Sequence, residues 1–220
     1  MKLRLILISV LFLIMFGCTV YHNGTNKLTP VENYLEYQND FFPIEIGKEM
    51  NYNIYSLEND KMVLSNTEVS VVTEYKEKKI KLGGRLMNVP VFRLKYFEYE
   101  GPLLKSESEV YLLKTKEGIA FTTILSEKKN LIINEFIPSS EEFDGLRNLI
   151  LNIDMVNNIS ELEWKGHDLL IIKDKIYFHS SLVYRERFYR RNVGLVRDIR
   201  TLEGILIYDM IYEPEDTKVY

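Results

Sequence analysis

IYFHSSLVYRERF, the sequence of residues 176–188, carries a clear period-two alternation of side chains. On an extended backbone, Ile176 and Phe178 fall on one face, whereas Arg185 and Arg187 fall on the other. Side chains of a β-strand point alternately to opposite sides, so alternation over this length indicates a strand with one buried face. The stretch therefore predicts one long strand and a mainly β fold.

Further strand-like segments lie on both sides of this stretch. They cover residues 49–55, 63–75, 89–100, 107–115, 119–125, 131–137, 193–200 and 202–212. Gly83-Gly84, within a charged hairpin tip from Lys76 to Arg85, and Gly101-Pro102 mark turns between them. Antiparallel neighbours joined by tight turns are the usual arrangement of such segments. We expect one domain over residues 41–220, built as a single antiparallel meander or curved sheet, or as a partly open barrel.

One helix is predicted within this domain. Ser139 and Glu142 have the spacing of a capping box, and apolar residues recur at helical spacing from Phe143 to Ile153. A helix over residues 140–156 follows from this pattern. The apolar run at residues 149–151 leaves a strand open as the alternative.

The first residues have the features of an export signal. Lys2 and Arg4 precede an apolar run at residues 5–16, and Gly17 and Cys18 close it. A membrane-spanning helix needs roughly 20 apolar residues, and this run is shorter, so a permanent anchor is the weaker interpretation. Residues 1–17 are therefore predicted to be a cleaved signal segment.

The end of this segment, Ile14-Met15-Phe16-Gly17-Cys18, resembles the lipobox of bacterial lipoproteins. The resemblance implies that Cys18 is lipidated, that cleavage precedes it, and that the new N-terminus is acylated. Several acyl chains, such as palmitate, hold a protein at a membrane more firmly than one chain does. Residues 18–40 would then be the lipidated cysteine and a flexible tether. We expect an exported protein at the cell membrane or an outer membrane.

Two further segments resemble the ends of exported bacterial β-domains of unknown function. Residues 41–52 read FFPIEIGKEMNY and resemble the opening of these domains. Residues 191–196 read RNVGLV and resemble a strand near their ends. These resemblances imply a style of fold and carry no catalytic residues.

The composition limits the classes of partner. The only cysteine is Cys18, so no intramolecular disulfide is expected after processing. Loss of Lys2 and Arg4 leaves 26 of the 28 basic residues against 32 acidic ones, a net charge near −6. A mildly acidic protein is a poor default binder of nucleic acid or anionic lipid, so no nucleic-acid partner is expected.

Motifs for catalysis, metal binding and nucleotide binding are missing from the sequence. His22, His167 and His179 lack the close spacing that zinc ligands require. No nucleophile elbow and no phosphate-binding loop occurs. We therefore expect no enzyme activity, no metal site and no cofactor.

Arg185, Arg187 and Arg191 form the candidate binding site, because alternation places all three on one strand face. Guanidinium groups bind phosphates and carboxylates through paired hydrogen bonds, so an anion or acidic glycan is the predicted ligand. The alternative is an exposed strand face paired with acidic residues of neighbouring strands. The lysine-rich tip at residues 76–81 is expected to be solvated.

Three functions are compatible with these patterns. The leading hypothesis is a non-enzymatic envelope lipoprotein whose β-domain binds or scaffolds a protein, a glycan or an amphiphile. The alternative is a lipid or lipoprotein carrier that resembles the half-barrel acceptors of outer-membrane sorting. Such a carrier needs an apolar cavity, which the helix at residues 140–156 could cover. An envelope enzyme comes third.

Overall fold

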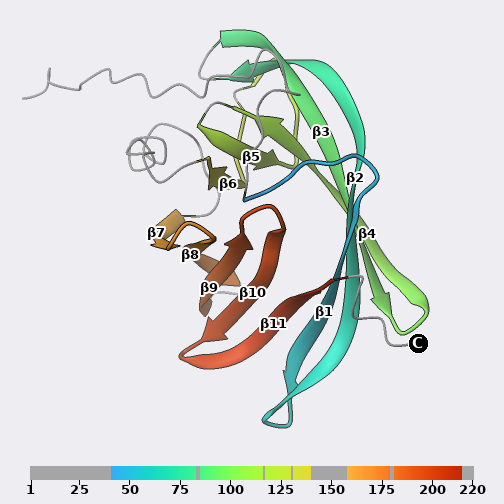
Figure 1. Ribbon diagram of the computed structural model, residues 1–220, viewed down its shortest axis with the longest axis vertical. Helices are drawn as coiled ribbons and strands as arrows, with labels where there is room; N and C mark the ends of the chain where they lie inside the picture. The colour runs from blue at the N-terminus through green and yellow to red at the C-terminus, as the bar shows by residue number, and fades with distance from the viewer. Residues whose placement is uncertain are drawn as a thin grey trace, which may run out of the picture.

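The computed structural model describes residues 41–82, 85–115, 117–129, 131–139, 158–178 and 181–214. These residues form one antiparallel sheet of eleven strands that curls strongly into a half-barrel (Figure 1). The predicted mainly β fold with a single curved antiparallel sheet is therefore confirmed. No helix occurs in these ranges, and the helix predicted at residues 140–156 lies outside them.

The strands follow the chain as two meanders. They are β1 (Glu49–Glu58), β2 (Lys61–Leu82), β3 (Arg85–Glu100), β4 (Leu103–Lys114), β5 (Gly118–Thr122), β6 (Glu135–Pro138), β7 (Asn158–Lys165), β8 (Leu169–Phe178), β9 (Ser181–Arg190), β10 (Gly194–Leu202) and β11 (Ile205–Glu213). Their order across the sheet is β6-β5-β4-β3-β2-β1-β11-β10-β9-β8-β7. The first and last strands of the domain are thus paired with each other in the middle of the sheet.

The segment that predicts one long strand is in fact a hairpin. β8 ends at Phe178, β9 begins at Ser181, and these two residues face each other across the ladder. The prediction of a single strand at residues 176–188 was wrong because the alternation continues through the two-residue connection. The pairing also reverses the faces, since Ile176 lies opposite Val183 and therefore shares its face.

Other predicted turns are found where the glycines indicate them. β2 and β3 pair up to Leu82 opposite Arg85, so only Gly83 and Gly84 connect them. The residues from Lys76 to Arg85, predicted as a charged tip, mostly continue the two strands instead. β4 and β5 are joined through a turn in which the Thr115 amide donates to the carbonyl oxygen of Gly118 at 2.9 Å.

Gly118 is required at this turn by close packing. A Cβ atom built on Gly118 would lie 2.2 Å from the carbonyl oxygen of Ile137 and 2.7 Å from the Phe136 ring. Both distances are far below van der Waals contact, so only glycine allows β5 and β6 to approach this closely.

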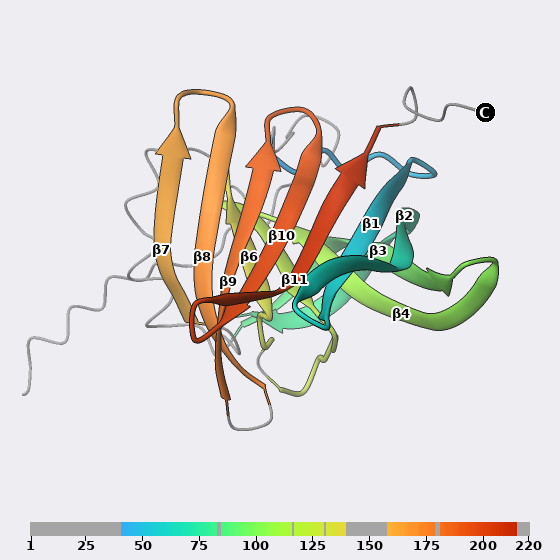
Figure 2. The ribbon, with the colours of Figure 1, turned by 90° about the horizontal axis from the view of Figure 1, so that it is seen from below.

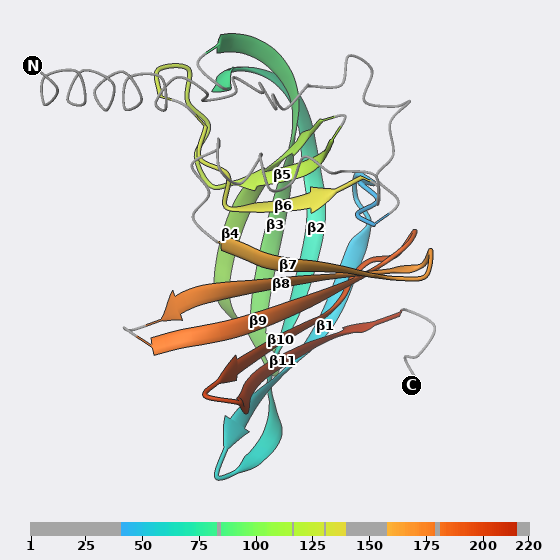
Figure 3. The ribbon, with the colours of Figure 1, turned by 90° about the vertical axis from the view of Figure 1, so that its left-hand side faces the viewer.

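Irregular pairing produces the strong curl of the sheet. The register shifts near Ile54 in β1, Val72 in β2, Glu98 in β3, Leu195 and Arg200 in β10, and Ile159 in β7. A bulge bends its strand and increases the local right-handed twist. Figure 2 and Figure 3 show the result, in which the β7–β11 wall faces the wall made by β2–β4.

The hydrophobic core fills one half of the concave face. Phe92, Leu112 and Ile172 are at most 2 % exposed and come from both walls. The segment before β1 completes the core, with the Phe41 ring 5.3 Å from that of Trp164 and the Phe42 ring 5.3 Å from that of Phe121. We call this part the apolar half.

The opposite face of the sheet is also covered near the end of β2 and the start of β3. Val91 and Phe92 are neighbours in β3, and both are buried although they point to opposite faces. Residues 123–133, the β5–β6 loop, lie against this region. The Lys81 amide donates to the Ser126 carbonyl at 3.0 Å, and the Leu131 amide donates to the Lys81 carbonyl at 2.9 Å.

Candidate functional site

The other half of the concave face is occupied by charged side chains, which we call the ionic cluster. Its members are Glu135 of β6, Asp174 of β8, Arg185 and Arg187 of β9, and Asp198 and Arg200 of β10. The register explains why they meet: Asp174 lies opposite Arg185, and Arg187 lies opposite Asp198. Four strands of the curled sheet therefore bring opposite charges together.

Arg187 lies at the centre of the cluster and is only 1 % exposed. Its Nη2 donates to Asp174 Oδ2 at 3.0 Å, and its Nη1 forms an ion pair with Glu135. The same Nη1 donates to the Tyr189 hydroxyl at 3.3 Å, and that hydroxyl donates to Glu135 Oε1 at 2.6 Å. This guanidinium therefore joins β6, β8 and β9 within the concave face.

Arg185 pairs with Asp198 in a two-pronged geometry. Its Nε donates to Oδ1 at 2.9 Å and its Nη2 to Oδ2 at 2.6 Å, while Arg200 Nη2 donates to the same Oδ2 at 3.1 Å. Burial alone would raise the pKa of Asp198, but the two guanidinium groups outweigh it and hold that pKa below its usual value. Asp198 is therefore a permanent anion.

Glu68 of β2 lies beside the cluster in a different electrostatic environment. Burial, together with repulsion from Glu98 and Asp198, raises the pKa of Glu68 to about 7 despite the attraction of Arg200 and Arg185. Burial likewise raises the pKa of Tyr208, whose ring lies 4.1 Å from the Arg200 guanidinium. This edge of the cluster can therefore change charge near neutral pH. At the centre, burial raises the pKa of Asp174 to about 6 despite the attraction of Arg185 and Arg200, whereas Asp198 stays ionised.

Three buried atoms of the cluster make no hydrogen bond within the described part of the chain. They are Asp174 Oδ1, Arg187 Nε and Arg200 Nε. Buried polar atoms are usually satisfied, because an unpaired donor or acceptor costs free energy. The cluster therefore has one acceptor and two donors with hydrogen-bonding capacity left over.

The structure places the three predicted arginines differently from the expectation. Arg185 and Arg187 lie inside the concave face, whereas Arg191 lies in the turn after β9. Arg191 Nε donates to the His167 carbonyl at 2.6 Å, and its guanidinium lies 5.0 Å from the Phe41 ring centroid. The prediction that all three share one strand face was wrong, because β9 ends at Arg190. Anion binding at these residues stays a prediction.

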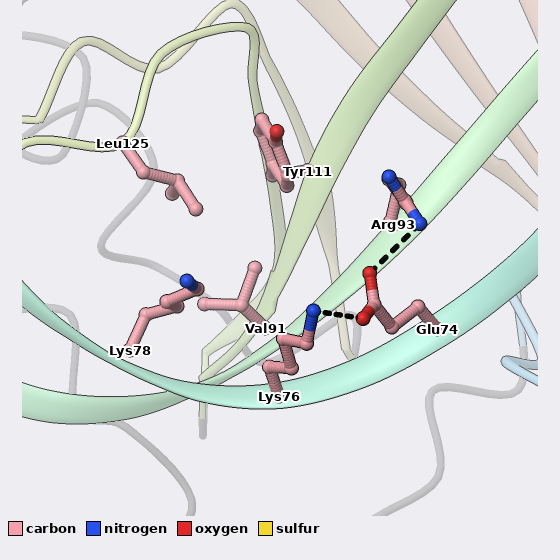
Figure 4. Close-up of a pocket in the computed structure, with 7 residues that line it drawn as sticks. All are labelled: Glu74, Lys76, Lys78, Val91, Arg93, Tyr111 and Leu125. Atoms are coloured by element: carbon pink, nitrogen blue, oxygen red, sulfur yellow. Dashed lines mark ion pairs between the residues drawn. The ribbon is translucent and has the colours of Figure 1, made fainter.

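A second hollow lies on the opposite face of the sheet, where β2, β3 and β4 meet the β5–β6 loop (Figure 4). This outer pocket of about 130 Å³ is lined by Glu74, Lys76, Lys78, Val91, Arg93, Tyr111 and Leu125. Glu74 forms ion pairs with Lys76 and with Arg93, the latter at 2.9 Å. Arg93 Nε is buried and makes no hydrogen bond to any described group.

Several sequence predictions concern residues that the structure does not describe. Cys18, His22 and His179 lie outside the described ranges, whereas His167 lies in the turn after Gly166. Within those ranges, no group of three or more His, Cys, Asp and Glu side chains is arranged to hold a metal ion. The same ranges contain no helix that is long and apolar enough to cross a membrane.

Comparisons with known proteins relate the chain by fold. No protein-family model matches it, and no curated protein does. A solved structure from Parabacteroides distasonis, provisionally named a lipoprotein, has 13% identity and a TM-score of 0.50 over 80% of this chain and 98% of its own. A solved structure from Bacteroides fragilis, provisionally named an exported protein with a YmcC-like fold, has 12% identity and a TM-score of 0.46. It also matches 80% of this chain and 98% of its own. The chain is thus similar in fold to a protein named as a lipoprotein.

Proposed function

We propose that this chain is a lipid-anchored protein of the bacterial envelope whose half-barrel binds or scaffolds another envelope component without catalysis. The sequence at residues 14–18 supports the anchor, since Cys18 supplies the thiol that would carry the lipid. The similarity in fold to a protein provisionally named a lipoprotein is consistent with export. Membrane attachment would come from the acyl chains.

The ionic cluster is the observation that supports the binding role. Its central carboxylates, Asp174 and Asp198, each accept hydrogen bonds from an arginine and act as counterions. A general base must be free to take a proton, so Asp198, whose pKa two guanidinium groups hold below its usual value, is poorly placed for catalysis. A polar ligand would instead meet the partly exposed edge, where Arg200 stacks on Tyr208 and its side chain is 33% exposed.

The carrier alternative is less well supported by the described residues. A carrier of acyl chains needs an open apolar cavity inside the curved sheet. Here the apolar half is filled by its own side chains, as the contacts of Phe41 with Trp164 and of Tyr75 with Phe92 illustrate. The scaffold role therefore fits the concave face better than the carrier role.

Lipidation of Cys18 is the test of the proposal. Cells that express the full chain are labelled with a palmitate analogue, and membranes are then separated from soluble material. We expect label on the parent and on a Thr19→Ser control, and no label with loss of membrane partition for Cys18→Ser. Equal labelling and equal partition of Cys18→Ser would contradict the anchor.

The binding role is tested at the edge of the cluster. Arg200→Ala is compared with Arg197→Ala, which removes an arginine paired with Asp209 on the opposite face. We expect Arg200→Ala alone to weaken retention of the chain on isolated envelope material. Equal retention of both variants would contradict the proposal that the concave face binds an envelope component.

A further inference from the structure

One end of this acidic molecule is strongly basic. Six cations gather where β2 and β3 end and where the β5–β6 loop lies against them, namely Lys78, Lys79, Lys81, Arg85, Lys128 and Lys129. We call this group the basic tip, and it forms the top of the molecule in Figure 1. Lys76 pairs with Glu74 nearby, whereas none of the six forms an ion pair with a described carboxylate.

Backbone hydrogen bonds hold the two parts of the basic tip together. Lys81 bonds to Ser126 and to Leu131, so the loop between these two residues lies beside the end of β2. Lys128 and Lys129 are therefore fixed next to the strand lysines. Like charges held together repel one another, so such a cluster indicates an anionic partner that offsets the repulsion.

Aliphatic side chains are exposed among these cations. Leu86 is 48% exposed, Ile124 is 64% exposed and Ile132 is 45% exposed. Between β2 and the loop lies a hollow of about 440 Å³, whose lining includes Lys78, Lys79 and Ile124 together with one carboxylate, that of Glu127. Cations next to exposed aliphatic groups fit a lipid surface, where phosphates meet hydrocarbon.

The opposite end of the molecule offers a natural comparison. We call it the acidic tip; it contains the β1–β2 and β3–β4 turns, with Glu58, Asp60 and Glu100 exposed. It exposes Leu103 and Leu104 at 71% and 54%. Both tips therefore present aliphatic groups, and the sign of their charge distinguishes them.

We infer that the basic tip docks on anionic phospholipid headgroups of the membrane to which the chain is proposed to be tethered. The cations contact the phosphates, and Leu86 and Ile124 enter the interface. Each lysine near an anionic surface adds to the attraction, and salt weakens it. The inference rests on the proposed function in one respect only, which is that the lipid anchor keeps the domain close to the bilayer.

Docking is tested by placing a tryptophan at each tip of the full chain. Trp164, the only tryptophan, is first replaced by phenylalanine, and then Leu86→Trp or Leu103→Trp is added. The chains are mixed with vesicles of brominated phosphatidylcholine, with or without phosphatidylglycerol. We expect fluorescence quenching of the Leu86→Trp chain only when phosphatidylglycerol is present. Equal quenching at both tips, or none at Leu86→Trp, would overturn the inference.

Charge reversal provides the second measurement. Lys78→Glu, Lys79→Glu and Lys128→Glu together are compared with Lys61→Glu and Lys105→Glu at the acidic tip. Because these lysines are exposed, thermal unfolding should be nearly unchanged in both sets. We expect the basic-tip set to weaken binding to phosphatidylglycerol vesicles about a hundredfold, and the acidic-tip set to leave it unchanged. No weakening by the first set contradicts lipid docking.

The outcomes also separate this inference from the proposed function. Quenching of Leu86→Trp by added vesicles, in a chain that keeps Cys18 and yet takes up no palmitate label, would keep the docking and discard the anchor. A lipidated chain whose basic tip is not quenched would keep the anchor and discard the docking. Retention on a soluble polyanion without any quenching in vesicles would assign the tip to another class of partner, and so would also overturn lipid docking.

Discussion

The centres of the two halves of the concave face are buried to a similar degree, but the two halves are held together by different forces. In the apolar half, Leu112 and Ile172 could each be replaced by another aliphatic residue of similar volume. In the ionic cluster, Arg187 needs Asp174 and Glu135, each from a different strand. The comparison teaches that apolar packing fills the space inside the curled sheet, whereas paired charges specify which strands face each other.

Arg187→Met should give the largest effect on stability. The substitution keeps most of the side-chain volume but leaves the fully buried Asp174 without its counterion. We expect unfolding free energy to fall by about 3–5 kcal/mol, measured by urea denaturation at neutral pH.

Two companion variants sharpen this first comparison. Asp174→Leu added to Arg187→Met removes the unpaired charge and should recover part of the loss. Lys95→Met breaks an exposed pair with Glu107 and should cost less than about 1 kcal/mol. A single Arg187→Met variant as stable as Lys95→Met would show that the ionic cluster does not specify the fold.

Leu112→Ala tests the apolar half and should have the second largest effect. The side chain is fully buried at the contact between the two walls, so its truncation leaves a cavity. We expect a loss of about 2–4 kcal/mol that is independent of pH and salt. Leu112→Met should recover most of the lost unfolding free energy. A loss that depends markedly on pH would contradict the distinction between the two halves.

Glu68→Gln should have the smallest effect, and its sign depends on pH. The pKa of Glu68 is raised to about 7 in the folded chain, so folding favours the protonated carboxyl. The parent therefore loses stability as the pH rises from about 4.5, the usual pKa of a glutamate, to about 7, and this group changes stability little outside that window. At pH 8 we expect the variant to be more stable by about 1–2 kcal/mol, and at pH 4 nearly equal, in paired urea titrations. A constant difference between pH 4 and 8 would contradict the assignment.

The local features of the fold were predictable from the sequence, because they depend on neighbouring residues. Gly83-Gly84 connects β2 and β3, and Gly101-Pro102 connects β3 and β4, as expected. The hairpin at the centre of residues 176–188 was missed, since Ser181 continues the alternation past the connection. Periodicity alone does not distinguish a strand that continues from one that folds back.

The candidate site could be predicted only in part. Alternation correctly placed Arg185 and Arg187 on one face, and pairing with acidic residues of neighbouring strands was the stated alternative. Glu135 was missed, because it is more than 50 positions from Arg187 in the sequence and meets it only after the sheet has curled. Which side of a strand is buried depends on the whole sheet, and no local pattern contains that information.

The pairing of β1 with β11 has a mechanical consequence. β1 is the sixth of the eleven strands across the sheet, so the N-terminal end of the domain leads directly into its middle. A pull transmitted from the N-terminal side would load hydrogen bonds on both edges of β1 at once, whereas a strand at the rim could peel away along a single edge. A domain suspended from this end is therefore held by a strand that is paired along both of its edges.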